Sequence, residues 1–242
     1  MSGLRPTGSS VGDVDALGED LERRFRTTRT TVTAGGHTIE LVHPASPEDL
    51  IDESDFERDE RLPYWADLWP AAVVLARRVA SMRGGGRTLL ELGCGAGLVA
   101  TAAALSGFDV TATDYYEDSL LFTRLNVGRN GGSAPAVRLV DWRNLPPDLG
   151  AFDVVVASDV LYEHTYGTLV AAAVARALRP TGLAILADPG RIAAGDFVDA
   201  ARRHGLEVWT ADRVRYKHGE AAQTIDLYEL WWPPNRRVAG RG

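Results

Sequence analysis

The alternation of strand-like and helix-like segments from residue 87 onward constrains the fold of this chain most. Short runs rich in apolar and β-branched residues are followed by longer segments with apolar residues at helical spacing. Seven strands are expected, at residues 88–92, 109–113, 136–140, 152–158, 183–187, 206–210 and 224–231, and helices at 97–105, 117–130, 165–178 and 195–203. Strands that alternate with helices form a mainly parallel sheet. The sequence therefore predicts an α/β fold with a seven-stranded, mostly parallel sheet and helices on both faces.

The residues ahead of this region are expected to form a tail and an N-terminal extension. Residues 1–20 are rich in Gly, Ser and Asp, a composition typical of a disordered tail. Two β-rich runs, at 30–33 and 38–42, flank the pair Gly35-Gly36 and predict a β-hairpin. The hairpin and the loop that follows it are assigned to residues 21–62.

That loop is acidic. Residues 48–60 contain eight acidic residues and one basic residue. Such a stretch is either a solvated loop or a surface that attracts a basic partner. A helix is expected at 65–82, with Pro70 in its first turn. The main domain is assigned to 63–232, and residues 233–242 are expected to be a flexible C-terminal tail.

Composition and charge argue against several classes of protein. The net charge of −7 is opposite to the basic surface of a general nucleic-acid binder. No run of about 18 apolar residues is present, so no membrane-spanning helix is expected, and the N-terminus lacks the apolar segment of a signal peptide. The lone Cys94 forms no internal disulfide, which suits the cytoplasm. The five His residues lack metal-ligand spacing, so no metal is expected. No feature indicates an oligomeric state.

A glycine-rich turn follows the first strand of the main domain. Leu90-Glu91-Leu92-Gly93-Cys94-Gly95-Ala96-Gly97 leaves a strand and opens a helix. Glycines at such a turn let the main chain bend tightly and approach a ligand closely. The spacing is G-x-G-x-G, whereas the dinucleotide fingerprint is G-x-G-x-x-G/A, and Leu98 occupies its last position. The turn therefore predicts a nucleotide-like cofactor other than NAD.

Polar residues follow the next three strands at the same edge of the predicted sheet. Asp114 lies about 20 residues beyond the glycine turn, where a carboxylate can accept from ribose hydroxyls; the alternative is a helix N-cap. Asp141 can accept a hydrogen bond from an adenine amine, and Trp142 can stack on the adenine ring. The alternative is that Trp142 is packed in a loop. Ser158 and Asp159 end the most apolar strand, where ligands bind, or they cap a helix.

Taken together, the turn at 91–97, Asp114, Asp141-Trp142 and the run 158–162 resemble the class I, seven-β-strand methyltransferases that use S-adenosylmethionine (SAM). More narrowly, the chain is similar to methyltransferase family 16, which includes many protein-lysine methyltransferases. The marks of that family are Asp-x-x-Tyr at 159–162 and Pro-Tyr-Trp-Ala-Asp-Leu-Trp-Pro at 63–70. The latter run and Asp-Pro-Gly-Arg at 188–191 are similar to the lysine methyltransferases that act on the electron transfer flavoprotein β-subunit. The resemblance covers residues 30–232.

This resemblance implies a Rossmann-like fold, SAM as cofactor and S-adenosylhomocysteine (SAH) as product. Together with the polar residues above, it assigns one set of residues to the cofactor pocket: Trp69, Gly93, Cys94, Gly95, Asp114, Asp141, Trp142 and Ser158. It places Asp159 and Tyr162 at the methyl-transfer site, as catalytic residues. Cys94 then serves as a small residue of the turn, because no charged neighbour in sequence activates it as a nucleophile.

The leading interpretation is methyl transfer from SAM to a protein lysine amine. Asp159 would orient the amine, and Tyr162 would close the channel. A small-molecule N- or O-methyltransferase on the same fold is the alternative. Two further alternatives from other classes are a nicotinamide-dependent oxidoreductase and a non-catalytic SAM-binding protein. His164 is either a general base or a surface residue at a helix start. Arg191 contacts an acidic substrate group or forms an exposed ion pair.

Overall fold

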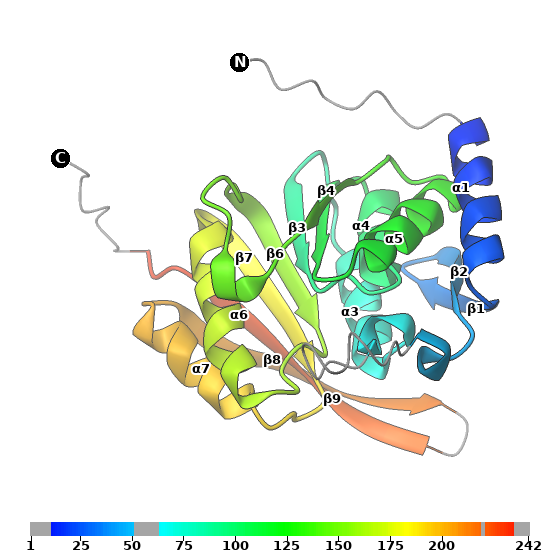
Figure 1. Cartoon of the computed structure of the whole chain (residues 1–242). Helices are drawn as coiled ribbons and strands as arrows, with labels where there is room; N and C mark the ends of the chain where they lie inside the picture. The colour runs from blue at the N-terminus through cyan, green and yellow to red at the C-terminus, as the bar shows by residue number, and fades with distance from the viewer. Residues whose placement is uncertain (1–10, 51–62, 219–220, 235–242) are drawn as a thin grey trace.

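The computed structural model describes residues 11–50, 63–218 and 221–234, and Figure 1 shows their arrangement. A seven-stranded sheet has the order β5-β4-β3-β6-β7-β9-β8. Its strands are β3 (Thr88–Leu92), β4 (Asp109–Asp114), β5 (Ala136–Leu139), β6 (Phe152–Ser158), β7 (Leu178–Asp188), β8 (Glu207–His218) and β9 (Ala221–Trp231). The first five pair in parallel, whereas β9 is antiparallel to both β7 and β8. The predicted seven-stranded, mostly parallel sheet is confirmed.

The strand order reverses at the centre of the sheet. From β3 the chain continues outward through β4 and β5, and it then returns to β6 on the other side of β3. In open α/β sheets, ligands bind in the crevice beyond the carboxyl ends of the strands where this reversal occurs. The fold therefore directs attention to the segments that follow β3 and β6.

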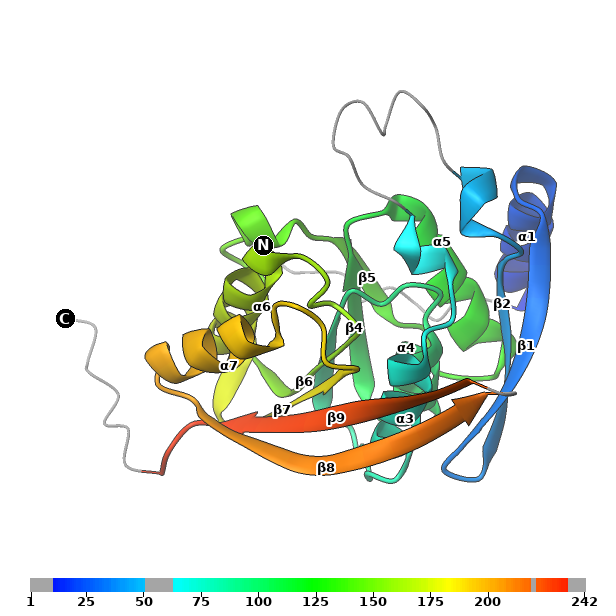
Figure 2. The ribbon, with the colours of Figure 1, turned by 90° about the horizontal axis from the view of Figure 1, so that it is seen from below.

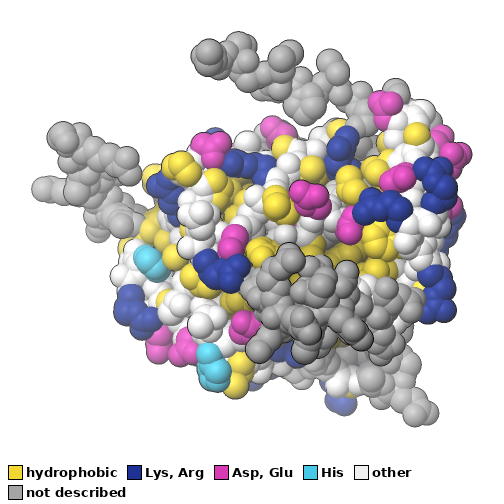
Figure 3. All heavy atoms as spheres, in the orientation of Figure 1, with side chains coloured by type: hydrophobic (Ala, Val, Ile, Leu, Met, Phe, Trp, Pro, Cys, Tyr) yellow, Lys and Arg dark blue, Asp and Glu magenta, His cyan; other side chains and the backbone are white. Residues whose placement is uncertain are grey.

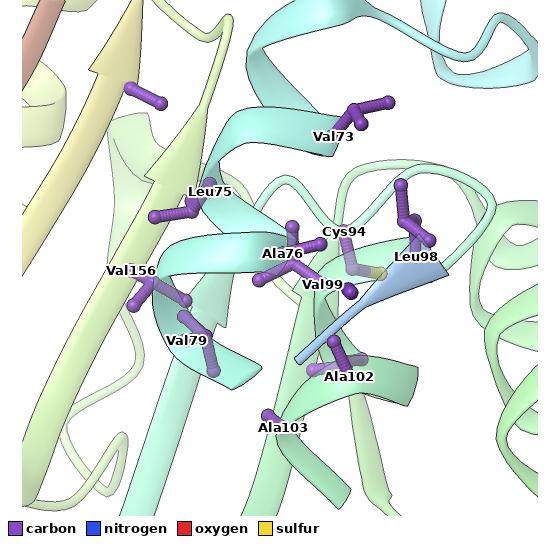
Figure 4. Packing of buried hydrophobic residues seen from close by; sticks show 14 of the residues in the cluster. Val73, Leu75, Ala76, Val79, Cys94, Leu98, Val99, Ala102, Ala103 and Val156 are labelled. Carbon is purple, nitrogen blue, oxygen red and sulfur yellow. The ribbon is translucent and has the colours of Figure 1, made fainter. Parts of the chain in front are cut away.

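Helices cover both faces of the sheet, and the side chains of β6 show why. Successive residues of a strand point to opposite faces. Val154 and Val156 pack into one core with α3 and α4, whereas Val155 and Ala157 pack into the other core with α6 and α7. Figure 4 shows the first core, with Val156 facing side chains of α3. The helices are α3 (Pro70–Ala80), α4 (Leu98–Leu105), α5 (Glu117–Arg129), α6 (His164–Ala177) and α7 (Ala194–Arg203).

The predicted N-terminal hairpin is confirmed as β1 (Thr27–Ala34) paired with β2 (His37–Pro44). It lies beside α1 (Val11–Arg24), and Figure 2 shows both elements next to α5. Residues 11–20 differ from the expected disordered tail, because they form most of α1. The reason is an apolar stripe, Val14, Leu17 and Leu21, which has helical spacing and packs against α5.

Two further elements differ from their expected bounds. The helix expected at 65–82 starts only at Pro70, because a proline disfavours helical backbone in the preceding residue, and Trp69 is extended (φ −79°, ψ 142°). Residues 64–66 form the short helix η2 (Tyr64–Ala66) instead. Strands β8 and β9 are longer than expected because they pair with each other from Glu207 to His218.

Short helices complete the described chain. They are η1 (Pro47–Leu50) and η3 (Trp142–Asn144), and most of the acidic stretch 48–60 lies outside the described residues. Each helix in the described part is too short or too polar to cross a bilayer. On the face visible in Figure 3, acidic and basic side chains are interspersed with apolar ones rather than gathered into one charged field.

Candidate active site

The carboxyl ends of the parallel strands surround a cavity of about 430 Å³. The segments after β3, β4, β5, β6 and β7 contribute to its wall, and the segment around η2 contributes from the N-terminal side. The structure brings all the predicted site residues to this cavity: Trp69, Gly93, Cys94, Gly95, Asp114, Asp141, Trp142, Ser158, Asp159 and Tyr162. Most of these residues lie at the ends of different strands, and the order of the strands in the sheet brings those ends together.

The glycine turn forms the part of the wall that follows β3. Gly93 and Gly95 have φ of 71° and 52°, which residues with a Cβ rarely adopt. A Cβ on Gly93 would lie 3.0 Å from Cγ1 of Val160, and one on Gly95 would lie 3.1 Å from the carbonyl oxygen of Trp65. The turn is therefore held in a conformation and a space that only glycine fits well.

Asp114, at the end of β4, holds the glycine turn. Its Oδ2 accepts a hydrogen bond from the main-chain N–H of Gly95 (2.9 Å), and its Oδ1 accepts from those of Tyr115 and Tyr116. Burial raises the pKa of Asp114, and these N–H donors oppose the rise. Tyr116, not Asp114, is the N-cap residue of α5. The carboxylate thus organises the turn while it lines the cavity.

Cys94 joins the cavity wall to the core. Its thiol accepts a hydrogen bond from Oγ1 of Thr123 (3.3 Å), and Figure 4 shows its side chain among apolar residues of α3 and α4. Burial raises the pKa of the Cys94 thiol well above its usual range. The residue is therefore a neutral thiol, in keeping with the expected role as a small residue rather than a nucleophile.

The segment after β5 forms a wall of rings and charges. Asp141 accepts hydrogen bonds from the main-chain N–H of Arg143 (2.9 Å) and from its Nε (2.9 Å to Oδ2). The Arg143 guanidinium lies 5.8 Å from the ring centroid of Tyr115. The Trp142 ring packs edge-to-face on Tyr166, with centroids 5.5 Å apart. Asp141 therefore holds this part of the wall by its bonds to Arg143, two residues later. The sequence did not predict this contact.

Asp159 occupies the end of the cavity that follows β6. It is the one non-glycine residue with positive φ (55°) among the described residues, and its side chain is only 2% exposed. Its Oδ1 accepts a hydrogen bond from Nε of Arg191 (2.6 Å), whereas Oδ2 is buried and has no hydrogen-bond partner in the described chain. The Arg191 guanidinium also lies 5.3 Å from the ring centroid of Trp69. Arg191 thus forms an ion pair, as one of its two alternatives predicts, but its partner is a buried acid; contact with an acidic substrate group stays a prediction.

Three tyrosines border the same end of the cavity. The Tyr162 ring packs edge-to-face between those of Tyr64 and Tyr166, at centroid distances of 5.3 and 5.0 Å. Although 36% of Tyr162 remains exposed, burial raises the pKa of its phenol well above its usual range. The phenol therefore keeps its proton at neutral pH and can donate a hydrogen bond, but it is no base. His164, the first residue of α6, does not line the cavity. Its Nδ1 lies 3.8 Å from Oδ2 of Asp196 in α7.

Sequence reasoning missed several residues of the cavity. Glu91, in β3 just before the glycine turn, is 1% exposed. Its buried Oε2 has no hydrogen-bond partner among the described residues. Burial raises the pKa of Glu91 well above its usual range. A charged residue inside an otherwise apolar strand was the signal available for it. Tyr64 and Tyr166 carry no such signal, because they enter the site through packing between distant segments.

Comparison with known proteins agrees with this geometry. Residues 90–186 match the family profile of a methyltransferase domain. The protein-lysine methyltransferase METTL21E of Bos taurus is 34% identical over 116 residues, 43% of this chain and 40% of that protein. The electron transfer flavoprotein beta subunit lysine methyltransferase of Xenopus laevis is 30% identical over 174 residues, 64% of this chain and 68% of that protein. The chain spans less than half the length of the METTL21E sequences that it matches.

A solved structure supports the fold. The magnesium protoporphyrin IX methyltransferase of Synechocystis PCC 6803, with bound SAM, superposes with a TM-score of 0.54 at 19% identity, covering 76% of this chain and 94% of that one. The strand order, the cavity at the carboxyl edge and these matches define one class. This chain belongs to the class I SAM-dependent methyltransferases.

The residues of the cavity fit SAM, the cofactor of this class. SAM carries a sulfonium and an ammonium, and the cavity wall holds a buried carboxyl oxygen of Glu91 that has no hydrogen-bond partner within the part of the chain that the structure describes. Gly93 and Gly95 line the cavity without side chains, so the main chain can approach a cofactor closely. Among the described residues, no group of three or more His, Cys, Asp or Glu is arranged to hold a metal ion.

Proposed function

We propose that this protein transfers a methyl group from SAM to a lysine amine of a protein. The observation that carries the proposal is Asp159: a carboxylate 2% exposed, lining the cavity directly after β6, with one oxygen left without a hydrogen-bond partner among the described residues. A carboxylate in this setting suits a cationic acceptor. The lysine methyltransferases among the relatives support the same acceptor class.

In this proposal the cofactor is held by the glycine turn and the segments after β4 and β5. When bound, SAM supplies an electrophilic methyl group on a sulfonium. The methyl group would pass to a neutral amine nitrogen as its bond to sulfur breaks, with the bond pair left on sulfur as SAH, and the methylated ammonium would release a proton to water. The chain contributes mainly by positioning the two reactants in line and excluding water.

The acceptor must lose a proton before it reacts. For a lysine with the reference pKa near 10.4, deprotonation at pH 7 costs about 4.6 kcal/mol. The aromatic rings of Tyr64, Trp69 and Tyr162 surround the acceptor end, and partial desolvation there lowers that cost by disfavouring the ammonium. Asp159 favours the ammonium instead, so its role in the proposal is to bind and orient the amine. The neutral phenol of Tyr162 supplies a hydrogen bond.

The exposed part of the acceptor end suits a macromolecule. Tyr64, Tyr162 and Ile192 are 39%, 36% and 62% exposed, and Ile192 adjoins Arg191 of the cavity wall. Aromatic side chains are enriched in protein interfaces. A protein that presents a lysine would cover these side chains while its amine enters the cavity.

Asp159→Asn tests the role of the carboxylate without disturbing the main chain, because Asn tolerates positive φ better than most other non-glycine residues. SAM affinity measured by calorimetry should stay unchanged, whereas kcat/KM should fall about 10-fold to 100-fold, as expected for losing a hydrogen bond to a charged group. Full activity in this variant would remove Asp159 from the proposal.

The acceptor class is tested with labelled SAM and host extract, using the wild type and Asp159→Asn. Label that enters a discrete protein band with the wild type, and is recovered as methyl-lysine after hydrolysis, supports the proposal. Label found only in the small-molecule fraction would instead identify a small-molecule methyltransferase. Absence of any SAM binding by the wild type would contradict both.

A further inference from the structure

The side chain of Arg191 fills the position where the proposed acceptor would bind. Its Nε donates to Oδ1 of Asp159 at 2.6 Å, and its guanidinium carbon lies 5.3 Å from the ring centroid of Trp69. A carboxylate on one side and an indole face on the other are the two surroundings that stabilise an alkylammonium in a protein. The same two groups cannot hold a second cation while Arg191 remains between them.

The arginine satisfies Asp159 only in part. Oδ2 of Asp159 is buried and has no hydrogen-bond partner in the described chain. A lysine ammonium has three donors on one nitrogen, so it can reach both oxygens from one position. A buried carboxylate left partly without partners raises the free energy of the protein. Because Arg191 reaches only Oδ1 here, its exchange for an ammonium that donates to Oδ2 as well would improve the hydrogen bonding of Asp159.

The main chain around Arg191 is fixed, whereas its side chain has access to solvent. Asp188 Oδ1 accepts hydrogen bonds from the main-chain N–H groups of Gly190 (2.8 Å) and Arg191 (2.7 Å). The Arg191 side chain is 33% exposed, in contrast to the 2% of Asp159. Arg191 can thus leave the cavity by rotation of its side chain while the loop after β7 keeps its shape.

We propose that Arg191 is a specificity-determining residue: its guanidinium holds the acceptor position between Asp159 and Trp69 until an alkylammonium displaces it. This inference rests on the proposed transfer to a lysine amine. A neutral acceptor or a weakly bound cation would leave the Asp159–Arg191 pair intact. Only a cation that binds both Asp159 and the surrounding rings offsets the loss of that pair.

The test uses two small cations and the full-length protein saturated with SAH. Guanidinium chloride at millimolar concentration reproduces the lost side chain, and n-butylammonium chloride reproduces the end of lysine. In calorimetric titrations, Arg191→Ala should bind guanidinium, and it should bind n-butylammonium about tenfold more tightly than the wild type. Arg191→Lys, which keeps a cation in place, should resemble the wild type. The double variant Arg191→Ala/Asp159→Asn should bind neither ion.

Sodium chloride at equal ionic strength is the control for screening, and thermal unfolding confirms that each variant is folded. Equal affinity of Arg191→Ala and the wild type for n-butylammonium would overturn the inference. In turnover assays with the protein acceptor found in extract, guanidinium should inhibit Arg191→Ala in competition with the acceptor. If guanidinium instead restored lost turnover, Arg191 would be a residue that positions Asp159, and the inference would be wrong.

Failure of this inference and failure of the proposed function give different results. If the wild type methylates no protein, the proposed function fails, and the two titrations still decide whether Arg191 occupies a cation position. If the wild type methylates a protein but Arg191→Ala binds neither ion, only the role of Arg191 is wrong.

Discussion

Asn126 connects the N-terminal hairpin to the cofactor turn, and its removal gives a sharp test of the energetics. Its side chain is fully buried and forms three hydrogen bonds of 2.8 Å with main-chain groups: Nδ2 donates to the carbonyls of Val42 and Ala96, and Oδ1 accepts from the N–H of Val42. Three such bonds contribute about 3 kcal/mol, and Asn126→Ala also leaves buried main-chain groups without partners. We expect a loss of about 3–5 kcal/mol in the free energy of unfolding.

Asn130 provides a matched control one helical turn later. Its side chain also forms three hydrogen bonds: with the main-chain N–H and carbonyl of Glu40 in the same strand β2, and with the carbonyl of Asn126. Asn130 is partly exposed, so water replaces the lost bonds in Asn130→Ala. We expect that variant to lose at most about 1 kcal/mol.

Urea unfolding followed by circular dichroism measures both losses. At 2–4 °C per kcal/mol for a domain of this size, Asn126→Ala should lower Tm by roughly 6–12 °C if 3 kcal/mol is lost, and Asn130→Ala by about 4 °C or less. Equal losses in the two variants would show that the number of hydrogen bonds, rather than their burial, sets the energy. That result would refute the reasoning.

Three further predictions concern the cavity and the opposite edge of the sheet. Glu91→Gln should raise Tm at pH 7, because burial raises the pKa of Glu91, so that ionisation of this carboxyl stabilises the unfolded chain relative to the folded one. The rise in Tm should vanish below about pH 4.5, where the carboxyl is protonated in both states. SAM binding by this variant should weaken in calorimetry. Asp153→Asn should lower Tm at pH 7, because the N–H of Thr88 lowers the pKa of Asp153; the difference should shrink as pH falls below about 3.8 and disappear below the lowered pKa of Asp153, with SAM affinity unchanged. Gly95→Ala should weaken SAM binding about tenfold, whereas Gly131→Ala, with φ of 78° and open space around it, should change Tm alone.

The sheet and the cofactor end of the cavity were predictable because their signals are local. The central strands β3 and β6 are short, mainly apolar runs, and the candidates Asp114, Ser158 and Asp159 lie at or directly after the ends of strands. Parallel strands place their carboxyl ends at one edge, so separate signals converge without knowledge of long-range contacts. For this reason Asp114, Trp142 and Ser158 were assigned to one cavity from spacing and resemblance, although their roles toward SAM stay predictions.

The remainder depends on contacts between distant segments. Arg191 pairs with Asp159, 32 residues earlier, and packs on Trp69 in another segment, and no periodicity indicates either contact. Helix α1 was missed for a different reason. Its glycines and acidic residues outweighed the apolar stripe that starts at Val14, although helical spacing was present in the sequence.

The position of Leu41 bears on how the chain can be shortened. This residue of β2 is fully buried and lines the cavity, so the hairpin supplies part of the wall that a domain boundary at residue 63 would remove. A truncated protein starting there would expose the apolar surface of α5 that α1 and β2 now cover, and unshielded apolar surface promotes aggregation during expression. Efforts to obtain a minimal enzyme should therefore retain the chain from α1 onward.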